Sequence, residues 1–218
     1  MTAIQTLAEL AITHPAASRV FQRHGLDYCC GGHTLLADVC RVKGLDPAAI
    51  LEEIAREDVR LERPHWDMVP IPDLIRYVVT EYHAPLRTEL PSLIALAAQV
   101  ESQHGETPGC PRGLRAHLEQ VHGAIVDHLA KEEKVLFPLI LEGYGARTAG
   151  PVRVLELEHD EHSRNLARTR ELTHNLTPPD EASPAWRTLY QRLGRLESVL
   201  FKHMHLENNV LFPRALNE

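Results

Sequence analysis

The chain has 218 residues, a formal net charge of -7 and 44% hydrophobic residues. This length is enough for a sizeable buried core, and the ordinary apolar content argues against intrinsic disorder. The acidic balance argues against nucleic acid or an anionic membrane as the main partner. The first ten residues lack a basic start followed by an apolar core, and no apolar run is long enough to cross a bilayer. We therefore expect a cytoplasmic protein.

Residues 1–62 predict a small helical domain. Its helices are expected around residues 7–12, 15–24, 34–43 and 46–60. Gly25 and Gly44 are the expected stops of the second and third helices, and Asp46 with Pro47 caps the fourth. Between the second and third lies the segment DYCCGG, residues 27–32. Its two glycines permit backbone angles that other residues avoid and predict an exposed, shaped loop.

Residues 63–72 contain three prolines and predict a linker. Residues 73–218 then show four long stretches whose apolar residues recur at steps of three and four, which indicates an all-α, antiparallel four-helix bundle. Turns rich in Gly, Pro and polar residues are expected near residues 103–111, 143–151 and 175–184. Pro85 and Pro91 fall inside the first stretch and predict a kink just after His83 or a helix in two pieces.

The inward stripes of these four helices are not wholly apolar. The second stripe is the clearest and runs through Leu114, Leu118, Val121, Ile125, His128, Glu132 and Val135. The fourth runs through Leu189, Leu193, Leu196, Leu200, His203 and Glu207 and closes with Val210 and Leu211. The first and third stripes contain His83 and His159. Each of the four stripes therefore brings a histidine into the predicted core.

An internal repeat relates these polar positions. The segment HLAKEEKVLFP starts at His128, and its near-copy HMHLENNVLFP starts at His203. One further histidine precedes each segment at a similar spacing: His83 lies 45 residues before His128, and His159 lies 44 residues before His203. The bundle thus contains two similar halves, each with one isolated His and one His-x-x-x-Glu pair.

The repeat favours a metal site. A carboxylate in an apolar core is costly unless it is paired, hydrogen-bonded or bound to a metal. A single core histidine is more often a structural residue, but six polar stripe positions in repeat register are not explained that way. The expected metal ligands are His83, His128, Glu132, His159, His203 and Glu207.

Imidazole and carboxylate ligands without thiolate suit iron, manganese or zinc. A structural zinc site usually has four protein ligands, so six indicate two metal ions that share carboxylates. We expect two iron ions with an oxo or hydroxo bridge, two histidines per iron, and Glu132 and Glu207 as bridging ligands. Glu133 aligns with Asn208 in the repeat, so we expect it to be a solvated charge; His162 is expected to line the site.

The chain resembles the di-iron proteins for repair of iron centres (RIC), the YtfE, ScdA and DnrN group of the hemerythrin-like superfamily. The resemblance covers nearly the whole chain, in DYCCGG, EHDEH, NLTPP and the closing HMHLENNVLFPRAL. It implies a hemerythrin-like bundle after an ScdA-type N-terminal domain, and the same six iron ligands. It also implies repair of iron-sulfur clusters damaged by nitrosative or oxidative stress, through iron donation or nitric oxide handling. Pro85 and His162 depart from the family pattern.

Cys29 and Cys30 are expected to form a thiol site. Adjacent cysteines rarely form a disulfide with each other, and thiolates in an exposed loop could accept nitric oxide or iron. The alternative is a pair of small residues that pack a turn. Cys40 and Cys110 are expected to be structural.

Two other functions use similar metal ligands. One is a hemerythrin-like protein that binds or senses oxygen or nitric oxide; such oxygen carriers use a less symmetric set with more histidines. The other is a di-iron oxidase, peroxidase or nitric oxide reductase, although ferritin-like sites usually have more carboxylates and the order Glu-x-x-His. The sequence thus leaves open whether the protein is an enzyme. The implied partners are damaged iron-sulfur proteins or assembly scaffolds and a small ligand such as nitric oxide, and the protein is expected to be a monomer or homodimer.

Overall fold

A computed structural model describes residues 1–58, 66 and 68–217. Within these residues the regular structure is helical, and the only β-type pairing is an isolated bridge between Thr6 and Leu35. The predicted all-α class is therefore confirmed. The chain divides into two compact units: a first unit of Met1–Leu74 with Phe201–Glu218, and a second unit of Ile75–Leu200.

The first unit begins with the short helices that the sequence predicts. They are α1 (Leu7–Thr13), α2 (Ala17–Arg23), α3 (Leu36–Lys43) and α4 (Pro47–Asp58). A capping box starts α1, because the Thr6 side chain accepts from the Glu9 amide and the Glu9 carboxylate accepts from the Thr6 amide. The predicted stops are also confirmed, since Gly25 and Gly44 adopt left-handed backbone angles with φ of 62° and 67°.

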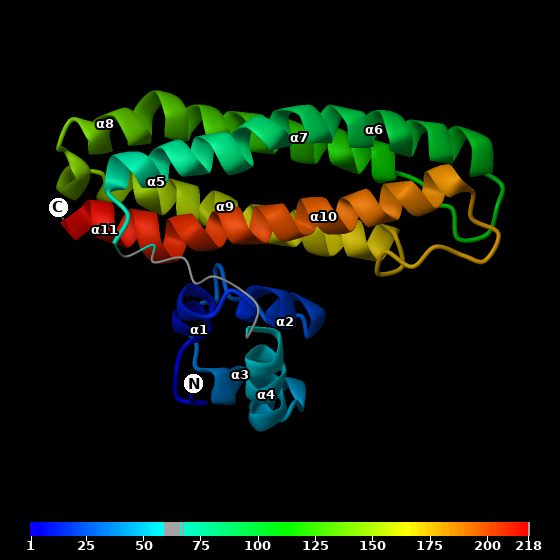
Figure 1. The fold of residues 1–218 in the computed structure, drawn as a ribbon. Helices are drawn as coiled ribbons and strands as arrows, with labels where there is room; N and C mark the ends of the chain where they lie inside the picture. The colour runs from blue at the N-terminus through cyan, green and yellow to red at the C-terminus, as the bar shows by residue number, and fades with distance from the viewer. Residues whose placement is uncertain (59–65, 67, 218) are drawn as a thin grey trace. The chain divides into compact units, whose positions relative to one another are not determined.

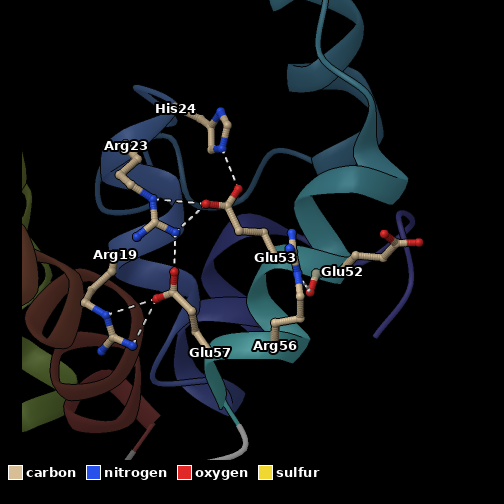
Figure 2. Close-up of polar contacts among 7 residues, drawn as sticks. All are labelled: Arg19, Arg23, His24, Glu52, Glu53, Arg56 and Glu57. Carbon is tan, nitrogen blue, oxygen red and sulfur yellow. Dashed lines mark hydrogen bonds and ion pairs between the residues drawn. The ribbon is translucent and has the colours of Figure 1, made fainter.

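Charged side chains join α2 to α4 across the surface of this first unit (Figure 2). Arg19 contacts Glu57 at 3.2 Å, and Arg23 contacts both Glu53 and Glu57. Nε2 of His24 lies 2.7 Å from a carboxylate oxygen of Glu53. Five side chains thus form one connected network over a core that includes Phe21, Leu36 and Ile54.

The prediction of an exposed DYCCGG loop is wrong. Tyr28, Cys29 and Gly32 are buried, because the loop packs against α1 and its Gly32 carbonyl accepts from the Ala8 amide at 2.8 Å. Neither Gly31 nor Gly32 has a positive φ. The glycine at position 32 is required by space rather than by backbone angle, since a β-carbon there would lie 2.6 Å from the Tyr28 carbonyl oxygen.

Four long helices lie side by side in the second unit (Figure 1). They are α6 (Ala84–His104), α7 (Leu114–Lys131), α9 (Ala149–Leu172) and the part of α10 (Pro184–Leu206) up to Leu200. The helix α7 packs against both α6 and α9. Two bidentate ion pairs fix α10, one from Arg192 to Glu89 of α6 and one from Arg170 of α9 to Glu197. This arrangement confirms the predicted four-helix bundle.

The remaining helical segments are shorter. They are α5 (Ile71–Val78), α8 (Phe137–Leu141), the 3₁₀ turn η3 (Gly145–Arg147) and α11 (Phe212–Asn217). The connections around residues 105–113 and 173–183 confirm two predicted turns, whereas Pro151 already lies in the first turn of α9. Residues 63–65 and 67 of the predicted linker, and the predicted helix end at Arg60, lie outside the described residues.

In the part of the chain that the structure describes, three single π-helical turns interrupt the long helices: η1 (Val79–His83), η2 (Glu132–Leu136) and η4 (Glu207–Leu211). A proline stands two residues after each turn, at Pro85, Pro138 and Pro213. A proline ring in an α-helix clashes with the carbonyl four residues earlier, and a wider turn relieves this clash. The interruption predicted near His83 is therefore confirmed as a π-turn, while Pro91 lies inside α6 without ending it.

The turn η2 also corrects the predicted second stripe. Val135 is 49% exposed, whereas Leu136 and Phe137 are buried. A π-turn holds one more residue than an α-helical turn, so the inward face moves to later residues than a strict α-helical period predicts. The other predicted members of the second and fourth stripes are buried.

Candidate metal centre

The six predicted ligands all have buried side chains. His83 ends η1, His128 lies in the last turn of α7, and His159 lies in the middle of α9. His83, Glu132, His159 and Glu207 are 0% exposed. His203 and His128 are 1% and 2% exposed. The sequence repeat therefore identified side chains that all belong to the protein interior.

Within the second unit, four of these residues converge. Nε2 of His83 lies 3.4 Å from one oxygen of Glu132, and Nε2 of His128 lies 3.5 Å from the other. Nε2 of His159 lies 3.1 Å from Nε2 of His128. Three imidazoles thus direct the same type of nitrogen toward the neighbourhood of one buried carboxylate.

The other His-x-x-x-Glu pair has similar local geometry. Nε2 of His203 lies 3.0 Å from a carboxylate oxygen of Glu207. These residues stand one helical turn apart, so their side chains project from nearly the same face. The π-turn η4 begins at Glu207, as η2 begins at Glu132. The two halves of the repeat therefore place their glutamates at the same point of the same local structure.

The six residues form two overlapping groups with ligand geometry. One group is His83, Glu132, His203 and Glu207, and the other is His128, Glu132, His159 and Glu207. Within each group the ligand atoms all lie within 4.8 Å of one another. Both groups contain the same two glutamates. Buried imidazole nitrogens and carboxylate oxygens at this spacing fit metal ions such as iron.

Residues 74–215 match the family model of the hemerythrin HHE cation-binding domain, and residues 3–58 match ScdA_N, a domain of unknown function (DUF542). The chain is 43% identical over 213 residues to the iron-sulfur cluster repair protein YtfE of Cronobacter sakazakii, covering 97% of this chain and 96% of that protein. It is 41% identical over 212 residues to YtfE of Escherichia coli O157:H7, with the same coverage. The chain belongs to the YtfE family.

The region that matches the hemerythrin model contains all six candidate ligands, and the region that matches ScdA_N contains the cysteine pair. This confirms the resemblance seen in the sequence. Among the described residues we find no helix with the length and apolar character that a membrane crossing requires.

Carboxylates outside the two groups hold the outer nitrogens of two histidines in this YtfE-family chain. Nδ1 of His83 lies 2.8 Å from Glu133, and Glu133 also contacts Arg87 at 2.9 Å. Nδ1 of His128 lies 3.0 Å from Glu158, which also contacts Lys131. A histidine that binds a metal commonly donates its other ring N–H to a carboxylate in this way.

These two contacts show what sequence reasoning misses. The prediction that Glu133 is merely a solvated charge is wrong, because its side chain is 27% exposed and hydrogen-bonded to a buried histidine. Burial alone would raise the pKa of Glu133, but hydrogen bonds from His83 and Arg87 and the positive charge of Arg87 lower it. Neither the apolar stripes nor the repeat predicts a role for Glu158. The position of Glu158 directly before His159, a predicted ligand, is the signal that could have found it.

His162 lies beside the groups without belonging to either. Its side chain is buried, and its ring meets the ring of His128 edge-on with centroids 4.9 Å apart. This is the place expected for a residue that lines the site.

The cysteine pair forms a third group of ligand type, together with Asp27. The Cys29 and Cys30 sulfurs lie 3.5 Å apart, and the Cys29 sulfur lies 3.2 Å from an Asp27 oxygen. The hydrogen bond with Cys30, burial and the nearby Asp27 charge raise the pKa of Cys29 well above its ordinary value. At neutral pH Cys29 is therefore a protonated thiol rather than a nucleophilic thiolate.

Proposed function

We propose that this protein repairs iron-sulfur clusters and that its activity depends on two iron ions bound inside the bundle. The observation that carries the proposal is the sharing of Glu132 and Glu207 by both ligand groups. Two adjacent cations need ligands that neutralise both charges, and shared carboxylates do this. The names of the YtfE relatives supply the class of reaction.

Each iron in this proposal receives two imidazoles. His83 and His203 would hold one ion and His128 and His159 the other, and Glu132 and Glu207 would be shared by both. Iron with such ligands supplies redox chemistry and an exchangeable position for a small molecule. The protein's own contribution is to hold these side chains in a dry interior and to orient the imidazoles. The balance of opposite charges makes the burial of both carboxylates acceptable.

The proposal extends to the surroundings of the site. Damaged iron-sulfur proteins or assembly scaffolds are the proposed partners, and nitric oxide is the proposed small ligand. The chain acts in the cytoplasm, as a monomer or homodimer. The Cys29 and Cys30 pair is a proposed thiol site for nitric oxide or iron. The high pKa of Cys29 limits that role to conditions that remove its proton.

Metal analysis tests the ligand assignment. Protein purified without added chelator should contain about two irons per chain. The variant Glu132→Gln should contain markedly less, because it removes a shared ligand from both groups. Glu161→Gln is the matched control, since Glu161 is exposed on α9. One zinc and no iron in the wild type would contradict the di-iron proposal.

A repair assay tests the function. The reduced protein is added to an iron-sulfur enzyme that nitric oxide has inactivated, and recovery of that enzyme's activity is followed. We expect recovery with the wild type and with Glu161→Gln, and none above background with His128→Ala or Glu207→Ala. Equal recovery with the ligand variants would rule out repair through this site. Reversible oxygen binding by the reduced protein would support a carrier instead.

A further inference from the structure

We infer that Glu133 and Arg87 are positioning residues for the metal ligand His83. Glu133 selects the imidazole tautomer with hydrogen on Nδ1, so that Nε2 presents its lone pair to the metal. Arg87 holds the Glu133 carboxylate in place for this task. The inference rests on the proposed metal centre and adds to it a pair of residues outside the six ligands.

The ring of His83 lies between two successive glutamates. Its Nε2 is 3.4 Å from Glu132, and its Nδ1 is 2.8 Å from Glu133. A carboxylate can only accept a hydrogen bond, so the Nδ1 that faces Glu133 carries the hydrogen. A neutral imidazole has one N–H, which leaves the lone pair on Nε2, the nitrogen on the side of the shared ligand Glu132.

The π-turn η2 allows two adjacent residues to reach one ring. In an α-helix successive side chains point about 100° apart. A π-turn spreads one extra residue over the turn, which brings successive side chains closer in direction. Glu132 and Glu133 are the first two residues of η2. One can therefore face the metal position while the other reaches the opposite edge of the same imidazole.

Stacking fixes the plane of the His83 ring but not its direction. Phe137 stacks on His83 with ring centroids 5.9 Å apart and an interplanar angle of 18°. A ring flipped by 180° would keep this plane and exchange the two edges, so stacking does not distinguish the two states. The hydrogen bond to Glu133 does distinguish them. Glu133 therefore decides which nitrogen faces the metal.

Arg87 contacts Glu133 from α6, which begins directly after His83. It stands four residues after His83, on nearly the same face, and its guanidinium lies 2.9 Å from the Glu133 oxygen that faces His83. The Arg87 side chain is 42% exposed and the Glu133 side chain 27% exposed. A planar guanidinium limits the rotation of the carboxylate and balances its charge near a site that already contains two glutamates.

The second half of the repeat has a different residue at the position of Glu133. The residue that aligns with Glu133 is Asn208, and its side-chain amide is directed to the Cys29 carbonyl at 3.5 Å. Asparagine offers both a donor and an acceptor, so it would not impose one tautomer on a histidine. The two halves thus differ at this position in agreement with the contacts of the two side chains: Glu133 accepts from His83, whereas Asn208 donates to the Cys29 carbonyl.

Nuclear magnetic resonance of the metal-free protein tests the tautomer directly. Long-range ¹H–¹⁵N correlations of labelled histidines, assigned with His83→Gln, should show His83 protonated on Nδ1 in the wild type. In Glu133→Gln the amide can donate to Nδ1, and we expect the hydrogen to move to Nε2 in a substantial fraction of molecules. Glu161→Gln, an exposed glutamate on α9, should leave the His83 signals unchanged.

Metal retention provides the second readout. Iron-loaded Glu133→Gln should lose iron to a chelator about 10–100 times faster than the wild type, the usual effect of removing such an outer partner. Arg87→Met should show a smaller increase, and Arg87→Lys should recover part of the loss by keeping the charge. Arg164→Met, at an exposed arginine of α9, is the control for charge alone.

The outcomes separate this inference from the proposed function. An unchanged tautomer and unchanged iron loss in Glu133→Gln would overturn the inference and leave the di-iron proposal intact. A wild type that binds no iron would overturn the di-iron proposal and, with it, the role of Glu133 and Arg87 in metal binding. A circular dichroism spectrum that matches the wild type ensures that the variants are compared as folded proteins.

Discussion

Gly32 is enclosed by neighbours that leave no room for a side chain. A β-carbon at this position would lie 2.6 Å from the Tyr28 carbonyl oxygen and 3.0 Å from the β-carbon of Ala8. The closer neighbour is backbone, so it cannot move away without displacing the loop that contains the cysteine pair. A single methyl group at Gly32 thus forces either a shift of this loop or a shift of α1.

We expect Gly32→Ala to lower the free energy of unfolding by about 1–3 kcal/mol, the usual cost of overpacking. Urea unfolding measures this change. Gly123→Ala is the matched control, because Gly123 lies in α7 and a β-carbon added there would meet no atom within 4 Å. It should raise stability by about 0.5–1 kcal/mol, since alanine favours a helix. Wild-type stability in Gly32→Ala would show that the loop adapts freely.

The residues of the candidate site show which features of a single side chain can be predicted from the sequence. The burial of the six predicted ligands was predictable because each replaces an apolar residue in a regular stripe, and the repeat pairs them. The partnership between Glu133 and His83 was not predictable, because it joins residues 50 positions apart and the residue aligned with Glu133 in the repeat is Asn208. The buried state of Cys29 was not predictable either, because its carbonyl accepts a hydrogen bond from Asn209, which lies 180 positions later in the chain.

Among the helices, α10 depends on paired charges as well as on its apolar stripe. The bidentate pair between Arg170 and Glu197 joins α9 to α10, with the Glu197 side chain only 10% exposed. A buried carboxylate that loses its cation keeps the cost of its burial. This pair therefore matters more to the packing of the bundle than an exposed ion pair would.

The expected result is a loss of about 1–3 kcal/mol in the free energy of unfolding for Arg170→Met. Arg168→Met provides the comparison on the same helix, because Arg168 and its partner Glu171 are 58% and 65% exposed. Its effect should stay within about 0.5 kcal/mol. Thermal and urea unfolding of both variants measure the difference, and equal effects would show that burial of Glu197 has no special cost.

The existence of the helices was easier to predict than their internal geometry. Apolar periodicity indicated four bundle helices and the glycine stops marked the ends of α2 and α3, all of which are confirmed. The π-turns were not predicted, because a stripe at steps of three and four presumes an α-helix. The error at Val135 follows directly, since the stripe was continued through η2 without the extra residue.

For the molecule as a whole, the first unit should be sensitive to acid. Hydrogen bonds from His24 and Arg23 and their positive charges lower the pKa of Glu53 below its ordinary 4.5, although burial opposes this. Arg23 and Arg19 lower the pKa of Glu57 in the same way, again against burial. The unfolded chain therefore binds more protons than the folded one at acidic pH. The stability from this network is fully present above about pH 4.5 and is lost as pH falls below it.

Hydrogen exchange measured by mass spectrometry between pH 7 and pH 3, corrected for the intrinsic rate at each pH, follows this loss in α2 and α4. Glu53→Gln combined with Glu57→Gln should remove much of the pH dependence. Glu52→Gln should not, because the Glu52 carboxylate lies outside the network (Figure 2). An unchanged pH dependence in the double variant would contradict the assignment of the acid sensitivity to these two carboxylates.

Metal loading should stabilise the second unit and the segment that contains His203 and Glu207. Ions that bind only the folded protein raise its stability by about 2.7 kcal/mol at a free concentration 100 times Kd. For a chain of this size we expect an increase in Tm of roughly 5–10 °C on anaerobic addition of ferrous iron. His159→Ala should abolish most of this shift, and differential scanning calorimetry measures it. An equal shift in this variant would place the binding elsewhere.

The proline that follows each π-turn has a consequence for comparing such sequences. In η1, η2 and η4 the proline comes six residues after the first residue of the turn. Each turn adds one residue to the helix, so the positions that face the core shift by one residue after it. The proline maintains the turn because its ring disfavours a regular α-helical turn at this point. Single-residue gaps within these turns should therefore appear when this bundle is aligned with related bundles that lack them. A design that copies this bundle must count the extra residue before it assigns any later position to the core.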